Sequence, residues 1–176
     1  ALASEMPACT LDDGQWVCSF ELSWSAPHSN NTVSYYQVQY EAAGGVSGSV
    51  QVVPTTCGGS DAMCYTMTRL RPATAYTLYV RAGNGVGLSL QSYPVVVTTP
   101  TASPDQVGDL LVSPPTGSTV GVSWSEPASN GLALSSYVVR VCDEQSGTCV
   151  SESLVGSPPL TSVVVGSLPS GRNYTV

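Results

Sequence analysis

The sequence predicts an all-β protein made of two β-sandwich domains in tandem, and three observations support this fold class. Short stretches such as residues 17–24 and 36–40 alternate apolar and polar residues, and clusters of Gly, Pro, Ser and Asn separate them. No segment keeps the three-to-four-residue apolar spacing of a helix over a dozen residues, so helix-rich folds are not expected. The length of 176 residues suits two sandwiches of roughly 100 residues each.

An internal repeat supports the tandem arrangement. Trp24-Ser25-Ala26-Pro27 recurs 100 positions later as Trp124-Ser125-Glu126-Pro127. Tyr36-x-Val38 recurs 101 positions later as Tyr137-x-Val139. The two halves are therefore expected to be domains of the same kind.

The segment 99–104, Thr-Pro-Thr-Ala-Ser-Pro, lies between the two copies of the repeat. Its prolines and small polar residues disfavour both a helix and a central strand, so we expect a short, stiff linker there. This places domain 1 at residues 1–100 and domain 2 at residues 101–176.

The charge composition argues against two classes of partner. Charged residues make up 10% of the chain, all five basic residues are Arg, and the formal net charge is -7. No basic patch is available to neutralise phosphates, so neither nucleic acid nor an anionic membrane surface is an expected partner. No apolar run reaches the roughly 18 residues of a membrane helix, so direct membrane insertion by this segment is not expected.

Six cysteines form three pairs that are close in sequence: Cys9 with Cys18, Cys57 with Cys64, and Cys142 with Cys149. Such spacing suits a disulfide within a hairpin, which predicts three local bonds and an oxidising compartment. A zinc site is the alternative, but it is disfavoured because zinc motifs use closer cysteine spacing or several histidines, and His28 is the single histidine.

Residues 70–87 give the most specific motif, L-R-P-A-T-A-Y-T-L-Y-V-R-A-G-N-G-V-G. This stretch resembles, at every fixed position, the signature of strands E and F of fibronectin type III domains, L-x-P-x-T-x-Y-x-x-x-V-x-A-x-N-x-x-G. The resemblance extends over nearly the whole chain and implies two immunoglobulin-like sandwiches. It further implies that Trp24 and Trp124 are buried strand-B tryptophans and that Tyr76 and Tyr174 are tyrosine corners.

The sequence departs from the family pattern in two ways. The close cysteine pairs are additions, with Cys57 and Cys64 between strands C′ and E, and Cys142 and Cys149 at the C to C′ turn. Domain 2 is expected to be incomplete at its C-terminus, lacking most of strand F and all of strand G. An open sheet edge needs covering, either by further chain or by a strand donated from another chain.

No arrangement typical of an enzyme is found, and no cofactor or metal site is expected. His28 is expected in a loop, and no partner nucleophile is evident for it. Asp12-Asp13 and Asp143-Glu144 lack the oxygen pattern of a calcium site. Two sequons, at Asn30 and Asn173, predict N-glycosylation.

These observations predict a non-catalytic structural or adhesive module of a larger extracellular or cell-surface glycoprotein, with other protein domains and glycans as candidate partners. The expected binding loops of domain 1 are residues 28–33, 57–64 and 83–88. The loop 57–64 is preferred because its predicted disulfide lowers the conformational entropy lost on binding. Two alternatives stay open: spacer domains of a secreted carbohydrate-active enzyme, and a filament subunit completed by strand donation.

Overall fold

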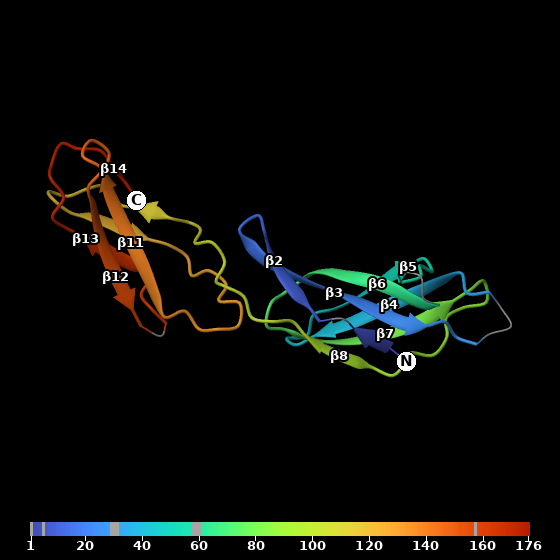
Figure 1. The fold of residues 1–176 in the computed structure, drawn as a ribbon. Coiled ribbons are helices and arrows are strands. Elements are labelled where there is room, and N and C mark those ends of the chain that lie inside the picture. Colours follow the sequence, from blue (N-terminus) through green and yellow to red (C-terminus); the bar gives the residue numbers. More distant parts are fainter. Residues whose placement is uncertain (1, 5, 29–31, 58–60, 157) are drawn as a thin grey trace. The chain divides into compact units, whose positions relative to one another are not determined.

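The computed structural model describes all residues except 1, 5, 29–31, 58–60 and 157, and side chains from residue 6 onward. Regular structure in this part of the chain consists of strands alone (Figure 1). The strands are β1 (Leu2–Ser4), β2 (Ala8–Asp12), β3 (Gln15–Ser25), β4 (Tyr35–Ala42), β5 (Ser47–Val52), β6 (Ala62–Leu70), β7 (Ala75–Gly83), β8 (Val95–Thr98), β9 (Leu111–Val112), β10 (Val120–Ser123), β11 (Ser136–Asp143), β12 (Cys149–Val155), β13 (Ser162–Val165) and β14 (Tyr174–Thr175). Among the described residues, a helix able to cross a membrane is not found.

The chain divides into two units, Ala1–Ala102 and Ser103–Val176, which we describe separately as domain 1 and domain 2. In domain 1, β3 pairs with β1 and β2 and also with β6, and this makes one sheet. The second sheet has the order β5-β4-β7-β8. All of these pairings are antiparallel, so the predicted all-β sandwich is observed.

Alternation along the strands builds the core of domain 1. In β3, residues Phe20, Leu22 and Trp24 are buried while the residues between them are partly exposed. The Trp24 ring meets the ring of Tyr36 from the opposite sheet edge-on, with centroids 5.1 Å apart. The core is completed by buried residues from both sheets: Cys18, Val38, Val52, Met67, Leu70, Tyr76, Leu78, Val80 and Val97.

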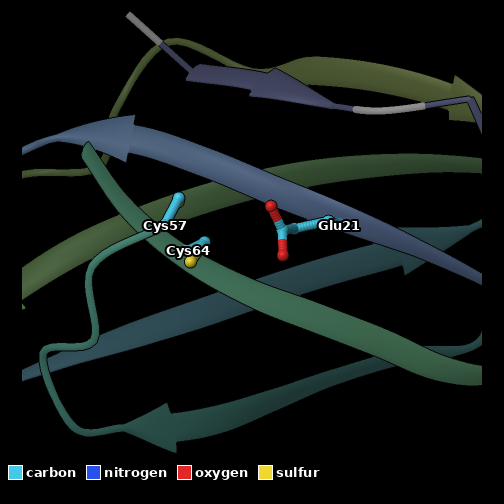
Figure 2. Close-up of side chains that lie close together, drawn as sticks. All are labelled: Glu21, Cys57 and Cys64. Carbon is cyan, nitrogen blue, oxygen red and sulfur yellow. The ribbon is translucent and has the colours of Figure 1, made fainter. Parts of the chain in front are cut away.

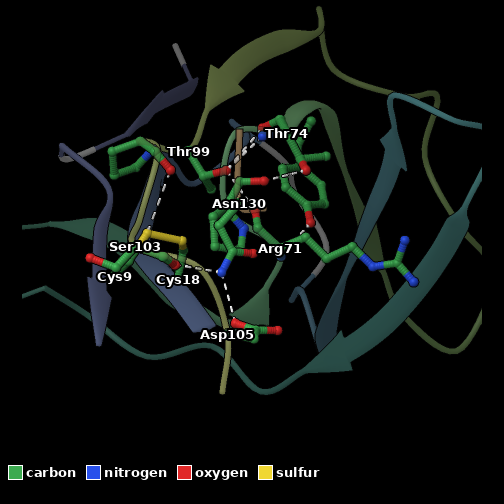
Figure 3. Close-up of a disulfide and its surroundings, with 11 residues drawn as sticks. Cys9, Cys18, Arg71, Thr74, Thr99, Ser103, Asp105 and Asn130 are labelled. Atoms are coloured by element: carbon green, nitrogen blue, oxygen red, sulfur yellow. Dashed lines mark hydrogen bonds between the residues drawn. A yellow bond between two sulfur atoms is a disulfide. The ribbon is translucent and has the colours of Figure 1, made fainter. Parts of the chain in front are cut away.

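The corner between β6 and β7 is held by hydrogen bonds to two hydroxyl groups, and Figure 3 shows the one from Thr99 beside Arg71 and Thr74. The amide of Arg71 donates a 2.9 Å hydrogen bond to the hydroxyl of Tyr76, five residues on, as expected for a tyrosine corner. The buried Thr99 hydroxyl accepts from the amide of Thr74 at 2.9 Å and donates to the carbonyl of Arg71 at 2.6 Å. Thr99, which the sequence suggested as the start of the linker, therefore belongs to the packing of domain 1.

Domain 2 repeats this design on a smaller scale. Its sheets have the orders β13-β10-β9 and β12-β11-β14. Trp124 is buried and meets Tyr137 with centroids 5.1 Å apart, the same distance as the pair in domain 1. The hydroxyl of the half-buried Tyr174 donates a 2.8 Å bond to the carbonyl of Pro169, again five residues earlier. The four core residues implied by the family resemblance therefore occupy equivalent places in the two domains.

One further backbone feature is repeated at the two corners. Three residues before each corner tyrosine the chain adopts a positive φ, at Ala73 (φ 48) and at Gly171 (φ 73). Glycine adopts this left-handed conformation at little cost, whereas alanine is strained in it. The turn is thus the same in both domains, but only domain 2 has the residue that suits it.

Candidate functional site

The structure forms two of the three predicted disulfides, and both join residues directly opposite each other on neighbouring strands. Cys9 pairs with Cys18 in the β2–β3 register, with Cα atoms 3.9 Å apart. Cys142 pairs with Cys149 in the β11–β12 register, with Cα atoms 4.0 Å apart. Each bond therefore fixes the alignment of one hairpin.

The register of the first hairpin follows from its turn. Asp13 (φ 47) and Gly14 (φ 77) both adopt positive φ between the paired residues Asp12 and Gln15. An Asp-Gly loop with two positive φ angles is the preferred connection for a two-residue hairpin. Counting back along the ladder from this turn brings Cys9 opposite Cys18. The acidic residues at this turn thus have a structural explanation.

The third cysteine pair is different, since Cys57 and Cys64 are unbonded thiols in the structure. The amide of Cys57 donates to the carbonyl of Ala62, and that of Cys64 donates to the carbonyl of Thr55, both at 2.9 Å. Cys57 therefore faces Ala62 rather than Cys64, and the two cysteines are diagonal neighbours on one face. Diagonal side chains are farther apart than directly opposed ones, which explains why the predicted staple is not formed here.

Glu21 lies next to these two thiols (Figure 2), on the outer face of the β3–β6 sheet. In the register, Glu21 lies opposite Thr66 and Ser23 lies opposite Cys64, so Glu21 and Cys64 are diagonal neighbours. The ligand atoms of Glu21, Cys57 and Cys64 all lie within 4.8 Å of one another, and each residue is partly buried. Glu21 could not be singled out from the sequence, because its position beside the thiols depends on the register between two distant strands.

The environment raises the pKa of the Cys64 thiol to about 11. The largest cause is its hydrogen bond with Cys57, followed by burial, the charge of Cys57 and the negative charge of Glu21. Cys64 is therefore protonated at neutral pH, which makes it a weak nucleophile.

In domain 2, Asp143 organises the turn that the Cys142–Cys149 disulfide closes. Its carboxylate accepts from the amide of Gln145 at 2.9 Å and from the hydroxyl of Ser146 at 2.8 Å, and it pairs with Arg172. These bonds, led by that from Arg172, hold the pKa of Asp143 at about 2. This buried acid therefore has a structural role as the anchor of the turn.

Two of the loops expected to bind partners, residues 28–33 and 57–64, are described only in part, and residues 58–60 of the second lie outside the described part of the chain. Residues 29–31 lie outside the described part of the chain, so the structure gives no placement for the Asn30 sequon in the loop 28–33. Asn173 is exposed immediately before β14, and its glycosylation stays a prediction. Since the Cys57–Cys64 staple is not formed, the reason for preferring the loop 57–64 as a binding site no longer holds.

The F to G loop, residues 83–88, is ordered by Asn84. Its side-chain oxygen accepts from the amides of Val86 at 2.9 Å and Gly87 at 3.3 Å. Val86 is 93% exposed at the tip. Together with Pro27 and Val33 from the neighbouring loop, these residues line a shallow groove at one end of domain 1.

These features define a class of protein: paired β-sandwich modules with disulfide-bonded hairpins and loops displayed at the ends of the sheets. The fibronectin type III domain model matches residues 15–98 and 105–176, so the chain belongs to the fibronectin type III family. Domains of this family are typically non-catalytic modules, and they are found in cell-surface proteins and also in enzymes of several domains.

Several curated proteins are similar to the chain. It is 28% identical over 166 residues to mouse fibronectin type-III domain-containing protein 3A, and 31% identical over 163 residues to endoglucanase B of Cellulomonas fimi. It is 28% identical over 127 residues to the cell adhesion molecule DSCAM of rat. These matches cover 89%, 88% and 65% of the chain but only 13%, 14% and 6% of the relatives.

Among solved structures, a segment of two fibronectin type III domains from chicken tenascin is similar to the chain. The match covers 99% of this chain and 85% of the other, with 22% identity and a TM-score of 0.48.

Proposed function

We propose that the chain is a non-catalytic part of a larger extracellular or cell-surface protein, in which its two domains act as a spacer and as a scaffold for protein contacts. The main support is the pair of cross-strand disulfides, Cys9–Cys18 and Cys142–Cys149, because such bonds persist in oxidising compartments. The family membership and the similarity to a cell adhesion molecule agree with this setting.

The proposed contact surface is the groove of domain 1 that Pro27 and Val33 line together with the F to G loop, residues 83–88. Loops on a rigid sandwich can vary without disturbing the core, which makes them suitable for recognition. Val86 offers an exposed apolar side chain on a loop that Asn84 holds in one shape, so that little conformational entropy is lost on binding.

Location and contact can be tested on the same source cells. An antibody against the chain should label intact, non-permeabilised cells or the matrix around them. Beads coated with the chain should bind those surfaces, and Val86→Asp should weaken binding on the order of tenfold if this residue is central to the contact. Val53→Asp is the matched control, since Val53 is 73% exposed but does not line the groove. Purely intracellular labelling, or equal binding by both variants, would contradict the proposal.

A second function has one specific observation in its favour, the 31% identity to endoglucanase B over 88% of the chain. In this alternative, the two domains are spacers that separate the catalytic domain of a secreted carbohydrate-active enzyme from its other domains. The native polypeptide, captured with the same antibody, would be mapped by peptide mass spectrometry and assayed on polysaccharide. Hydrolysis together with peptides from a catalytic domain would favour this second function over the adhesive one.

A further inference from the structure

We propose that Glu21, Cys57 and Cys64 form a binding site for one zinc-type divalent cation, held by two thiolates and one carboxylate. This site lies on the outer face of the β3–β6 sheet, and none of its three residues lines the loop groove proposed for protein contacts. It is independent of that function.

The donor set suits zinc. Zinc binds sulfur at about 2.3 Å and carboxylate oxygen at about 2.0–2.2 Å in tetrahedral sites, and a site with three protein ligands keeps one position open. Two sulfur ligands on one tetrahedral zinc lie about 3.8 Å apart, as the Zn–S distance requires. The three ligand atoms already lie within 4.8 Å of one another, so side-chain rotation alone can close the remaining gap.

The backbone holds the three residues in place without a metal. Cys64 and Glu21 are fixed relative to each other by the β3–β6 register. The segment that bears Cys57 is tied to β6 by two 2.9 Å hydrogen bonds, one on each side of the bridge between Thr56 and Met63. A preorganised site of this kind loses little conformational entropy when it binds an ion.

The two thiols differ from the disulfide-bonded cysteines in their position on the strands. Both disulfides of the structure join directly opposed residues, whereas Cys57 and Cys64 are diagonal neighbours with a carboxylate beside them. A disulfide does not use that carboxylate, whereas a bound cation would gain a third ligand from it. Binding forms two metal–sulfur bonds and one metal–oxygen bond, and it releases the two thiol protons to solvent without any transfer of electrons.

The test uses the full chain, purified without added reductant so that the two structural disulfides stay intact. Thiol counting by alkylation and mass spectrometry should find Cys57 and Cys64 free or protected by metal. Cadmium is the probe, because its thiolate bonds give an ultraviolet charge-transfer band, and zinc should displace it. We expect one cadmium per chain, with the band lost in Cys57→Ser and in Cys64→Ser.

Glu21→Gln decides whether the carboxylate is a ligand. We expect cadmium affinity to fall on the order of tenfold or more, since even residues that only support a ligand give losses of that size. Glu41→Gln, on an exposed position of β4, removes the same charge elsewhere and should leave affinity unchanged. Far-ultraviolet circular dichroism would show that each variant is folded.

Three results would overturn the proposal. One is a Cys57–Cys64 disulfide in the purified chain that excludes metal. Another is free thiols that give no cadmium–thiolate band, and the third is equal affinity in Glu21→Gln and the unmodified protein.

Discussion

Thr99→Val tests whether one buried hydroxyl holds together the β6–β7 corner and the end of β8. The substitution keeps the shape of the side chain but removes an acceptor for the amide of Thr74 and a donor to the carbonyl of Arg71. Leaving a buried polar group unsatisfied costs about 1–3 kcal/mol. Two groups are affected and both hydrogen bonds are only partly buried, so about 2–6 kcal/mol is an upper bound. We expect domain 1 to lose about 2–4 kcal/mol, a large share of the roughly 5–15 kcal/mol that stabilises a domain.

Urea unfolding followed by tryptophan fluorescence measures this loss. A Trp124→Phe background leaves Trp16 and Trp24 as reporters, and both lie in domain 1. Thr99→Ser is the control, because it keeps the hydroxyl and removes one methyl group, at a cost of about 1 kcal/mol. If Thr99→Val costs no more than Thr99→Ser, the hydroxyl does not organise the corner and the reasoning is wrong.

The remaining predictions concern the turns and the thiols. Ala73→Gly should stabilise domain 1 by about 0.5–1 kcal/mol in urea unfolding, because the relief of left-handed strain outweighs the added entropy of the unfolded chain. Gly171→Ala should destabilise domain 2 by a similar amount, and a gain in the stability of domain 2 would refute the argument. The pKa of Asp143 is lowered from 3.8 to about 2, so its contribution is present above pH 4 and is lost as pH falls toward 2. Acid unfolding of domain 2 should show this loss in the native protein but not in Asp143→Asn. Alkylation of Cys64 should be slow at pH 8 and accelerate toward pH 11. Cys57→Ala should increase the alkylation rate at pH 8, because it removes the largest cause of the raised pKa of Cys64. An unchanged rate would show that Cys57 does not raise this pKa.

The core could be predicted from the sequence because its signals are local or repeated. The alternation around Trp24, the repeat at Trp124 and the motif containing Tyr76 place these residues without knowledge of strand pairing. Their buried or half-buried positions in the structure agree with that expectation.

The thiol cluster could not be predicted, because it depends on long-range register. Cysteine spacing alone suggested that Cys57 and Cys64 form a hairpin staple like the other two pairs. The ladder places them diagonally instead, and the β3–β6 register brings Glu21, 43 positions before Cys64 in the sequence, to the same face. Likewise, the composition of residues 99–104 suggested a linker, since it could not show that the Thr99 side chain meets a distant corner.

The two hairpin disulfides also bear on how the chain would respond to a pulling force. Each bond encloses a short loop, with sequence separations of 9 and 7 residues. At roughly 3.4 Å per extended residue, the bonds withhold only about 30 Å and 24 Å of length. The 176 residues fully stretched would span about 600 Å. When a domain unfolds under force, the chain would therefore extend by nearly its full contour length. Reduction of the disulfides would increase the extension gained per unfolded domain only slightly.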